Sequence, residues 1–191
     1  MMTTNKIAVF ASGSGSNFQA IHDAIRNGKL AAELVLVVTD KPDAYVLRRA
    51  AAAGVEALAL RPQDFISKAD YERAILIELH SQGAEWLVLA GYMRLIGPVL
   101  LEAYPNRIVN IHPSLLPEFP GKDAIGQTLA AGREEAGVTV HFVDAGMDTG
   151  PIIAQRTFRL DNRDRQTVEE AVHRIEHELY PATLQKLFSR Q

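Results

Sequence analysis

The stretch Ile7-Ala8-Val9-Phe10-Ala11-Ser12-Gly13-Ser14-Gly15-Ser16-Asn17 decides the fold class of this protein. Its first half is a short, wholly apolar run, which is typical of a strand buried on both faces of a parallel sheet. Its second half is a glycine-rich turn, and the residues after it place Phe18, Ile21 and Ile25 on one helical stripe. A strand, a tight turn and a helix are therefore predicted in that order.

Three more short apolar runs follow, at residues 34–38, 86–90 and 107–111, and each ends in turn residues. Helical patterns lie between them, so strands and helices alternate along most of the chain. This alternation predicts an α/β fold with a Rossmann-like, doubly wound, mostly parallel sheet in a single domain spanning residues 1–191. Two later strands, at residues 138–143 and 151–160, are expected to make the sheet mixed.

Helix starts are predicted from capping pairs, in which a hydroxyl side chain precedes an acidic or amide side chain by three residues. The predicted pairs are Ser16 with Gln19, Ser67 with Asp70, and Thr167 with Glu170. Pro181 falls inside the last helical pattern, where it is expected to bend or end the helix.

The composition is that of an ordinary globular protein and excludes several functions. Of the 191 residues, 47% are hydrophobic and 23% are charged, the formal net charge is -3, and there is no cysteine. Disulfides and thiolate chemistry are therefore excluded, and no overall basic charge favours nucleic acid. The first residues lack a signal-peptide pattern, and no run reaches the ~18 apolar residues of a membrane span, so a cytoplasmic location is predicted.

The glycine-rich turn at residues 13–17 is suited to an anion. Glycine lets the backbone approach a ligand closely, and the free N–H groups and dipole of the following helix favour a phosphate. The turn is not a dinucleotide fingerprint, since Phe18 replaces the third glycine, nor a P-loop, since no Gly-Lys-Ser/Thr follows. A phosphate site and a plain strand-to-helix turn both remain open, and Asp40 after the second strand is a candidate ribose-binding acid.

Asn110 and His112 stand at the end of the fourth predicted strand. Side chains alternate along a strand, so these two point to the same face while Ile111 points to the other. Pro113 keeps His112 extended as the chain leaves the sheet, where ligands of such sheets bind. An amide that donates to an oxyanion is therefore expected beside an imidazole that shuttles a proton, the alternative being a structural histidine.

Residues 144–151 form a turn-rich loop with two carboxylates, Asp144 and Asp148. Asp and Gly favour turns for conformational reasons, so a purely structural loop is the alternative to a carboxylate that meets His112. No metal-ligand spacing accompanies these residues, and no metal site is predicted. His141 lies inside an apolar run and is interpreted as a structural histidine or a wall of the pocket rather than a base.

Six stretches spread along nearly the whole chain carry a resemblance to one family. They are residues 11–17 (ASGSGSN), 89–95 (LAGYMRL), 109–117 (VNIHPSLLP), 137–143 (GVTVHFV), 147–151 (MDTGP) and 176–181 (EHELYP). The third is specific to folate-dependent formyltransferases as a group, and the first fits an acceptor that carries a phosphate. On these motifs the chain resembles the glycinamide ribonucleotide formyltransferases of purine synthesis, which have a Rossmann-like fold.

The resemblance implies roles for the residues at matching positions. His112 would be the catalytic acid, Asn110 its partner at the formyl oxygen, and Asp148 the carboxylate that favours the protonated histidine. Together they would stabilise a tetrahedral intermediate. The ribonucleotide phosphate would bind at Gly15, Ser16 and Asn17, and its ribose at Glu176. The folate pocket would contain Lys68, Met93, Arg94, Leu95, Ile96 and Asn110.

The resemblance also implies the substrates. These are glycinamide ribonucleotide as the acceptor and 10-formyltetrahydrofolate as a consumed co-substrate, with no bound cofactor, no nucleic acid and no membrane partner, and a homodimer is left open. In many members a His-Thr-His stretch follows Pro120-Gly121; here Lys122-Asp123-Ala124-Ile125 replaces it, so acceptor contacts of those histidines are not carried over. Lys68 stands where other members can have Arg, which gives up a bidentate grip.

Two other classes of protein are alternatives. A formyltetrahydrofolate hydrolase is expected to carry an additional N-terminal domain, and a methionyl-tRNA formyltransferase an additional C-terminal domain, for which this chain has no room. A nucleotide-binding module without chemistry would depend on the glycine-rich turn alone.

Overall fold

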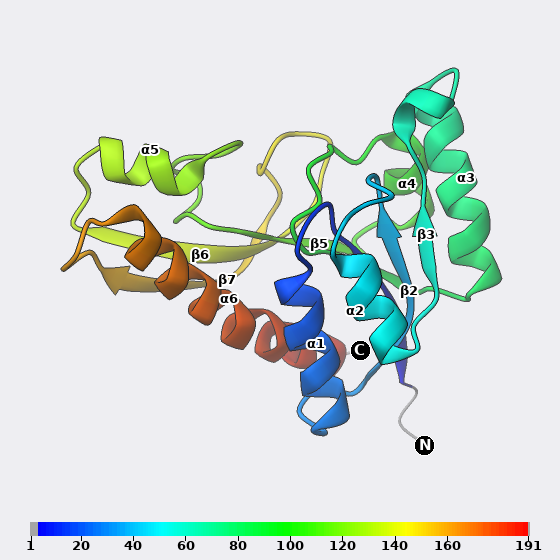
Figure 1. Ribbon diagram of the computed structural model, residues 1–191, viewed down its shortest axis with the longest axis horizontal. Coiled ribbons are helices and arrows are strands. Elements are labelled where there is room, and N and C mark those ends of the chain that lie inside the picture. The colour runs from blue at the N-terminus through cyan, green and yellow to red at the C-terminus, as the bar shows by residue number, and fades with distance from the viewer. Residues whose placement is uncertain (1–3, 191) are drawn as a thin grey trace.

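The computed structural model of the protein describes residues 4–190. Residues 1–3 and 191 lie outside this part. They include both limits of the predicted domain and the first of the residues in which no signal-peptide pattern was found. The described residues form one seven-stranded sheet with helices on both faces (Figure 1). The prediction of a Rossmann-like α/β fold with a mostly parallel sheet is confirmed.

The sheet runs in the order β3-β2-β1-β4-β5-β6-β7. Strands β1 to β5 are parallel and β6 and β7 are antiparallel, so the mixed character is confirmed. The short β3 was not predicted, because three residues are too few to show a period. The strands are β1 (Asn5–Phe10), β2 (Ala32–Thr39), β3 (Ala57–Ala59), β4 (Trp86–Leu89), β5 (Ile108–His112), β6 (Glu135–Phe142) and β7 (Ile152–Arg159).

Helices lie on both faces of the sheet, and each face has its own core. One face packs against α1 (Ser16–Arg26), α2 (Val46–Ala53) and α6 (Arg165–Phe188), and the other against α3 (Lys68–Ser81) and α4 (Pro98–Ala103). A short 3-10 helix, η1 (Pro62–Asp64), precedes α3, and α5 (Ala124–Ala130) contacts α6. Within residues 4–190, no helix combines the length and the apolar character needed to cross a membrane.

Two of the three predicted helix starts are wrong. Ser67 caps α3 as predicted, since its Oγ accepts the N–H of Asp70 at 3.1 Å. Helix α1 begins at Ser16 and is capped by Gly15, which has a left-handed φ of 73° and offers no side-chain bond. Helix α6 is capped by Asp164, whose carboxylate accepts the N–H of Thr167 at 3.0 Å, because aspartate is a better cap than threonine.

Pro181 does not end α6. The helix continues through it to Phe188, although the proline ring removes one N–H from the hydrogen-bond ladder. Tyr180 and Leu184, on either side of Pro181, are fully buried against the sheet. Tertiary packing therefore holds the end of the helix in place, where local preference alone would stop it.

The topology of the sheet changes direction between β1 and β4. From β1 the chain moves outward to β2 and β3, and from β4 it moves to β5 on the other side. In open α/β sheets, ligands bind beyond the carboxyl ends of the strands at such a switch point. The glycine-rich turn after β1 and the His112 end of β5 both lie along this edge of the sheet.

Candidate active site

A cavity of about 830 Å³ lies at the switch point, beyond the carboxyl ends of β1, β4 and β5. This volume is in the range of pockets that bind small organic molecules. Five segments that are far apart in the sequence line the cavity, together with His173 and Glu176 of α6. These segments are residues 12–17, 89–96, 110–113 and 121–125, and the loop that contains Asp148.

Almost all residues predicted for the site line this cavity. They are Gly15, Ser16, Asn17, Met93, Arg94, Leu95, Ile96, Asn110, His112, Asp148 and Glu176. Lys68 is the exception, because this first residue of α3 packs beside Gly97 and is not part of the cavity wall. Among residues 4–190, no group of three His, Asp or Glu side chains is arranged to hold a metal ion.

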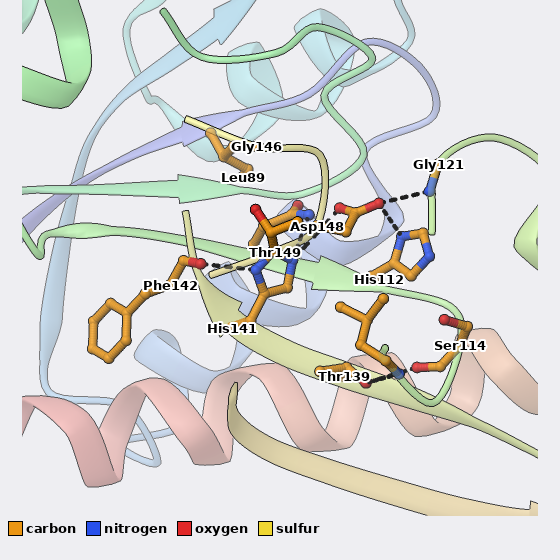
Figure 2. A network of polar contacts seen from close by, with 12 residues as sticks. Leu89, His112, Ser114, Gly121, Thr139, His141, Phe142, Gly146, Asp148 and Thr149 are labelled. Atoms are coloured by element: carbon orange, nitrogen blue, oxygen red, sulfur yellow. Dashed lines mark hydrogen bonds and ion pairs between the residues drawn. The ribbon is translucent and has the colours of Figure 1, made fainter. Parts of the chain in front are cut away.

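His112 is the last residue of β5 and is buried, with 6% of its surface exposed. Its Nε2 lies 2.9 Å from the carbonyl oxygen of Phe119. Its Nδ1 lies 3.5 Å from Oδ2 of Asp148, a contact that Figure 2 shows. A carbonyl oxygen only accepts hydrogen bonds, so Nε2 carries a proton. The second nitrogen, Nδ1, then faces the carboxylate of Asp148.

Asp148 connects the loop after β6 to this histidine. Its backbone is left-handed, with a φ of 55°, and its Oδ2 accepts the N–H of Gly121 at 2.8 Å. Burial alone would raise the pKa of Asp148, but hydrogen bonds from His141 and Gly121 and the charge of His112 lower the pKa below its ordinary value. The carboxylate is therefore held in its ionised form, which is the form that stabilises a protonated His112.

Asn110 faces His141 across the β5–β6 pair, where the two residues are register partners. The Nδ2 of Asn110 lies 3.2 Å from Nε2 of His141, and Nδ1 of His141 lies 2.8 Å from the carbonyl oxygen of Phe142. Nδ1 of His141 donates to that carbonyl, and Nε2 faces both the Asn110 amide and Oδ1 of Asp148, which lies 3.7 Å away. One amide proton of Asn110 is thus engaged and the other stays available to a ligand. His141 lines the cavity, which agrees with its interpretation as a wall of the pocket.

The glycine-rich turn is held by its backbone carbonyls. The carbonyl of Gly13 accepts the N–H of Val46 at 3.1 Å, and the carbonyl of Ser14 accepts from Nε of Arg49 at 2.7 Å. A Cβ atom added to Gly15 would lie 2.6 Å from Cγ2 of Val46, whereas one added to Gly13 would meet nothing within 4 Å. A side chain at Gly15 would therefore clash with Val46 at the start of α2.

Glu176 of α6 closes the cavity from the side opposite to α3. Its Oε2 accepts from Nδ2 of Asn17 at 3.1 Å, and the residue is 6% exposed. Burial raises the pKa of Glu176, although the Asn17 hydrogen bond and the charge of His173 oppose the shift. The Oδ1 of Asn17 is buried without a hydrogen-bond partner, so this corner retains an acceptor for a ligand.

Asp40 is not part of the cavity wall, which argues against its interpretation as a ribose-binding acid. Its carboxylate accepts from Oγ of Ser12 at 2.6 Å and from Nε of Arg94 at 3.0 Å. Sequence patterns did not single out these two contacts, because the partners lie 28 and 54 residues away along the chain.

The segment at residues 122–125, which replaces the histidine-containing stretch, does line the cavity. Asp123 has a left-handed φ of 53° and caps α5, and it also pairs with Arg165 at 2.6 Å. Arg165 and His173 line the cavity as well, together with Lys41 and Tyr92. None of these four was predicted, since each comes from a helix or loop whose local pattern signals no chemistry.

A Rossmann-like sheet with a cavity at its switch point, lined by a histidine, an aspartate and an amide, has the arrangement of an α/β enzyme site. Residues 5–184 match the family model "Formyl transferase", and the chain belongs to this family. It is 50% identical to a phosphoribosylglycinamide formyltransferase of Bacillus subtilis (strain 168) over 95% of this chain and 94% of that protein.

Two further relatives extend the comparison. A trifunctional purine biosynthetic protein adenosine-3 of Drosophila pseudoobscura pseudoobscura is 41% identical over 96% of this chain, which spans 14% of that longer protein. The crystal structure of glycinamide ribonucleotide transformylase 1 from Geobacillus kaustophilus superposes with a TM-score of 0.94 at 56% identity, covering 97% of this chain and 100% of that one. Nearly the full length is therefore shared with the Bacillus subtilis and Geobacillus kaustophilus proteins, and the fold with the latter.

Proposed function

We propose that this protein transfers a formyl group from 10-formyltetrahydrofolate to the amine of glycinamide ribonucleotide, a step of purine biosynthesis. The observation that carries the proposal is the grouping of Asn110, His112 and Asp148 in one cavity of a chain half identical to a phosphoribosylglycinamide formyltransferase. The folate is a consumed co-substrate, and the proposal includes no bound cofactor.

Formyl transfer begins when the amine nitrogen of the ribonucleotide attacks the formyl carbon. A carbon–nitrogen bond forms and the carbonyl electron pair moves to oxygen, which becomes an oxyanion. In this proposal the free amide proton of Asn110 and the ring of His112 donate to this oxygen, and the contacts of both side chains at the cavity support that role. Because the carbonyl of Phe119 retains the proton on Nε2, the Nδ1 side of His112 is the one that exchanges a proton with substrate.

The second half of the reaction moves a proton and breaks a bond. The attacking nitrogen loses a proton, and the carboxylate of Asp148 accepts it. Asp148 is ionised beforehand because its pKa is lowered, and it lies next to His112. Asp148 then passes a proton, directly or through a water molecule, to the folate nitrogen that carries the formyl group. The bond between the formyl carbon and that nitrogen then breaks and tetrahydrofolate leaves.

The two substrates are assigned to opposite sides of the cavity. The ribonucleotide phosphate binds at Gly15, Ser16 and Asn17, where backbone N–H groups begin α1, and its ribose binds at Glu176. The folate binds along residues 93–96 and at Asn110 on the α3 side. Arg94 faces the anionic tail of the folate; Lys68, outside the cavity wall, is kept as a weaker contact to that tail.

Turnover followed by ultraviolet absorbance tests this function. Formylfolate consumption should require glycinamide ribonucleotide and yield the formylated ribonucleotide by mass. Consumption without an acceptor would instead indicate a hydrolase, and consumption with charged methionyl-tRNA a tRNA formyltransferase. Binding of the ribonucleotide without turnover would support a binding module and contradict the proposal.

Three further statements belong to the proposal. The single domain spans residues 1–191, the protein works in the cytoplasm, and two copies associate as a homodimer. Light scattering on the purified chain measures the mass of the assembly, and cell fractionation measures its location. A monomer at micromolar concentration would contradict the homodimer, and recovery with membranes would contradict the cytoplasmic location. Neither result would bear on the proposed reaction.

A further inference from the structure

Asp40 is a buried acid that the reaction itself does not use. It directly follows β2 and is 7% exposed, although ionisable side chains this buried are rare unless they are paired. Each of its carboxylate oxygens has a partner: Oδ1 accepts from Oγ of Ser12 at 2.6 Å, and Oδ2 accepts from Nε of Arg94 at 3.0 Å. A carboxylate with both oxygens engaged fixes the positions of both donors.

The two partners of Asp40 hold one segment of the folate side. Ser12 lies between β1 and the turn at residues 13–17. Its Oγ accepts the N–H of Met93 at 2.9 Å, and its own N–H donates to the carbonyl of Gly91. Met93 and Arg94 are neighbours in the chain, so Asp40 reaches this segment twice, once through Ser12 and once directly. A third anchor joins the hydroxyls of Tyr92 and Tyr71, 2.9 Å apart, to α3.

The ion pair leaves part of the arginine available. Only Nε of Arg94 is bonded to Asp40, and 45% of the arginine side chain is exposed whereas 5% of the aspartate side chain is. The guanidinium fork is planar, so fixing Nε also fixes the direction in which the two terminal nitrogens point. Because Arg94 lines the cavity, these nitrogens can meet an anionic group there.

We propose that Asp40 is a positioning residue for the formyl donor: through Ser12 and Arg94 it sets the geometry of the segment at residues 92–96 and aims the Arg94 guanidinium at an anionic group of the folate. The inference rests on the proposed function, since it assumes a folate on that side. Alternate residues of β1 and β2, such as Phe10 and Val38, belong to the core under α3. Asp40 and Ser12 continue this alternation, so they act on the α3 side and not on the α1 side, where the ribonucleotide is assigned.

A double-mutant cycle on the full chain tests this inference. The variants are Asp40→Asn, Arg94→Gln and the pair, with Asp43→Asn as the matched control, because Asp43 is an exposed carboxylate in the same loop. Asp40→Asn should raise the KM for 10-formyltetrahydrofolate roughly 3- to 30-fold, as expected for residues in one network, and leave the KM for the ribonucleotide and kcat within twofold. In the Arg94→Gln background, Asp40→Asn should raise the KM for 10-formyltetrahydrofolate by less than a further twofold.

The outcomes separate the inference from the function. If the unchanged protein turned over no formylfolate with ribonucleotide, the proposed function would fail, and calorimetric titration with tetrahydrofolate would still show whether Asp40→Asn weakens binding through Arg94. Three results would overturn the inference: no change in folate KM or Kd, equal changes for both substrates, or multiplicative effects in the pair. Urea unfolding of each variant verifies that the comparison is made on folded protein.

Discussion

The two ends of the cavity are built differently. The turn at residues 13–17 is fixed to other elements by its backbone: Val46 and Arg49 of α2 bond its carbonyls, and Ser12 bonds the carbonyl of Gly91 after β4. The loop at residues 144–149 is fixed mainly by side chains. Asp144 accepts from Gly146 at 3.0 Å and from Thr149 at 2.6 Å, so much of this loop bonds only to itself.

The link between this second loop and the site is electrostatic. Asp148 accepts from Gly121 and lies 3.5 Å from His112 and 3.7 Å from His141. Backbone bonds between uncharged groups do not respond to pH, whereas pairs of carboxylates and histidines do. The turn at residues 13–17, where an anion is proposed to bind, therefore keeps its conformation through backbone geometry. The loop at residues 144–149, next to the proposed chemistry, is linked to the site through charged side chains.

Removing His112 is the strongest way to test the charged end. His112→Ala should lower kcat roughly 10²- to 10⁴-fold, because the group proposed to protonate the oxyanion is lost. Ribonucleotide binding, measured by calorimetric titration, should stay within a few-fold, since the turn at the other end is untouched. His80→Ala, an exposed histidine in the last turn of α3, is the control. A His112→Ala protein that kept a tenth of the original kcat would contradict the assigned role.

Asp148→Asn should have the next largest effect. The amide keeps the size of the side chain but no longer favours a protonated His112, so kcat should fall about 10²-fold, near the lower end for acid–base groups. Asp144→Asn in the same loop should have a smaller effect, because Asp144 bonds Thr149 and neither histidine. NMR titration of the His112 ring in both proteins measures the cause directly, and an unchanged ring titration would count against the mechanism.

The same variant makes a prediction for stability against pH. The pKa of Asp148 is lowered below its ordinary value, mainly because hydrogen bonds from His141 and Gly121 outweigh its burial. Such a group stabilises the fold fully above its ordinary pKa, and the contribution is lost as pH falls through the folded-state value. In urea unfolding from neutral pH down to about pH 3, the free energy of unfolding should therefore fall more steeply for the unchanged protein than for Asp148→Asn. Parallel curves would contradict the ionic contribution.

A pair of glycine variants tests the shape-determined end. Gly15→Ala should lower the free energy of unfolding by about 1–3 kcal/mol, because the new methyl group meets Val46 and the backbone is left-handed. Gly13→Ala should change it by less than about 0.5 kcal/mol, since nothing lies near its Cβ position. Urea denaturation measures both. Equal losses would show that packing against α2 does not distinguish the two glycines.

Glu176→Gln should have a small effect on stability at neutral pH. Burial raises the pKa of Glu176, so its contribution to stability is present below the ordinary value and is lost as pH rises through the folded-state value. Glutamine still accepts from Asn17, so the free energy of unfolding at neutral pH should change by less than about 1 kcal/mol. Because glutamine does not titrate, the fall of that free energy above about pH 5 should become shallower in the variant. A large loss at neutral pH would mean that the charge itself holds α1 to α6.

The amino-acid sequence alone predicted the α/β class and six of the seven strands in residues 4–190, and together with the family resemblance it predicted eleven of the residues that line the cavity. It could do so because these signals are local: apolar runs, a glycine-rich turn, and the alternation that places Asn110 and His112 on one face. Local signals failed where tertiary packing decides. The continuation of α6 past Pro181 and the choice of Gly15 as the α1 cap depend on neighbours such as Leu184 and Val46.

The tertiary structure showed which charged groups meet. Asp40 and Arg94 are 54 residues apart, and no pattern in one sequence relates them. Asp148 and His112 are 36 residues apart and were related beforehand only through the family resemblance. The order of strands brings them together, because β1, β4 and β5 end at one edge and the loops that follow them share a single cavity. It also left Lys68 outside the cavity wall, since this first residue of α3 packs beside Gly97.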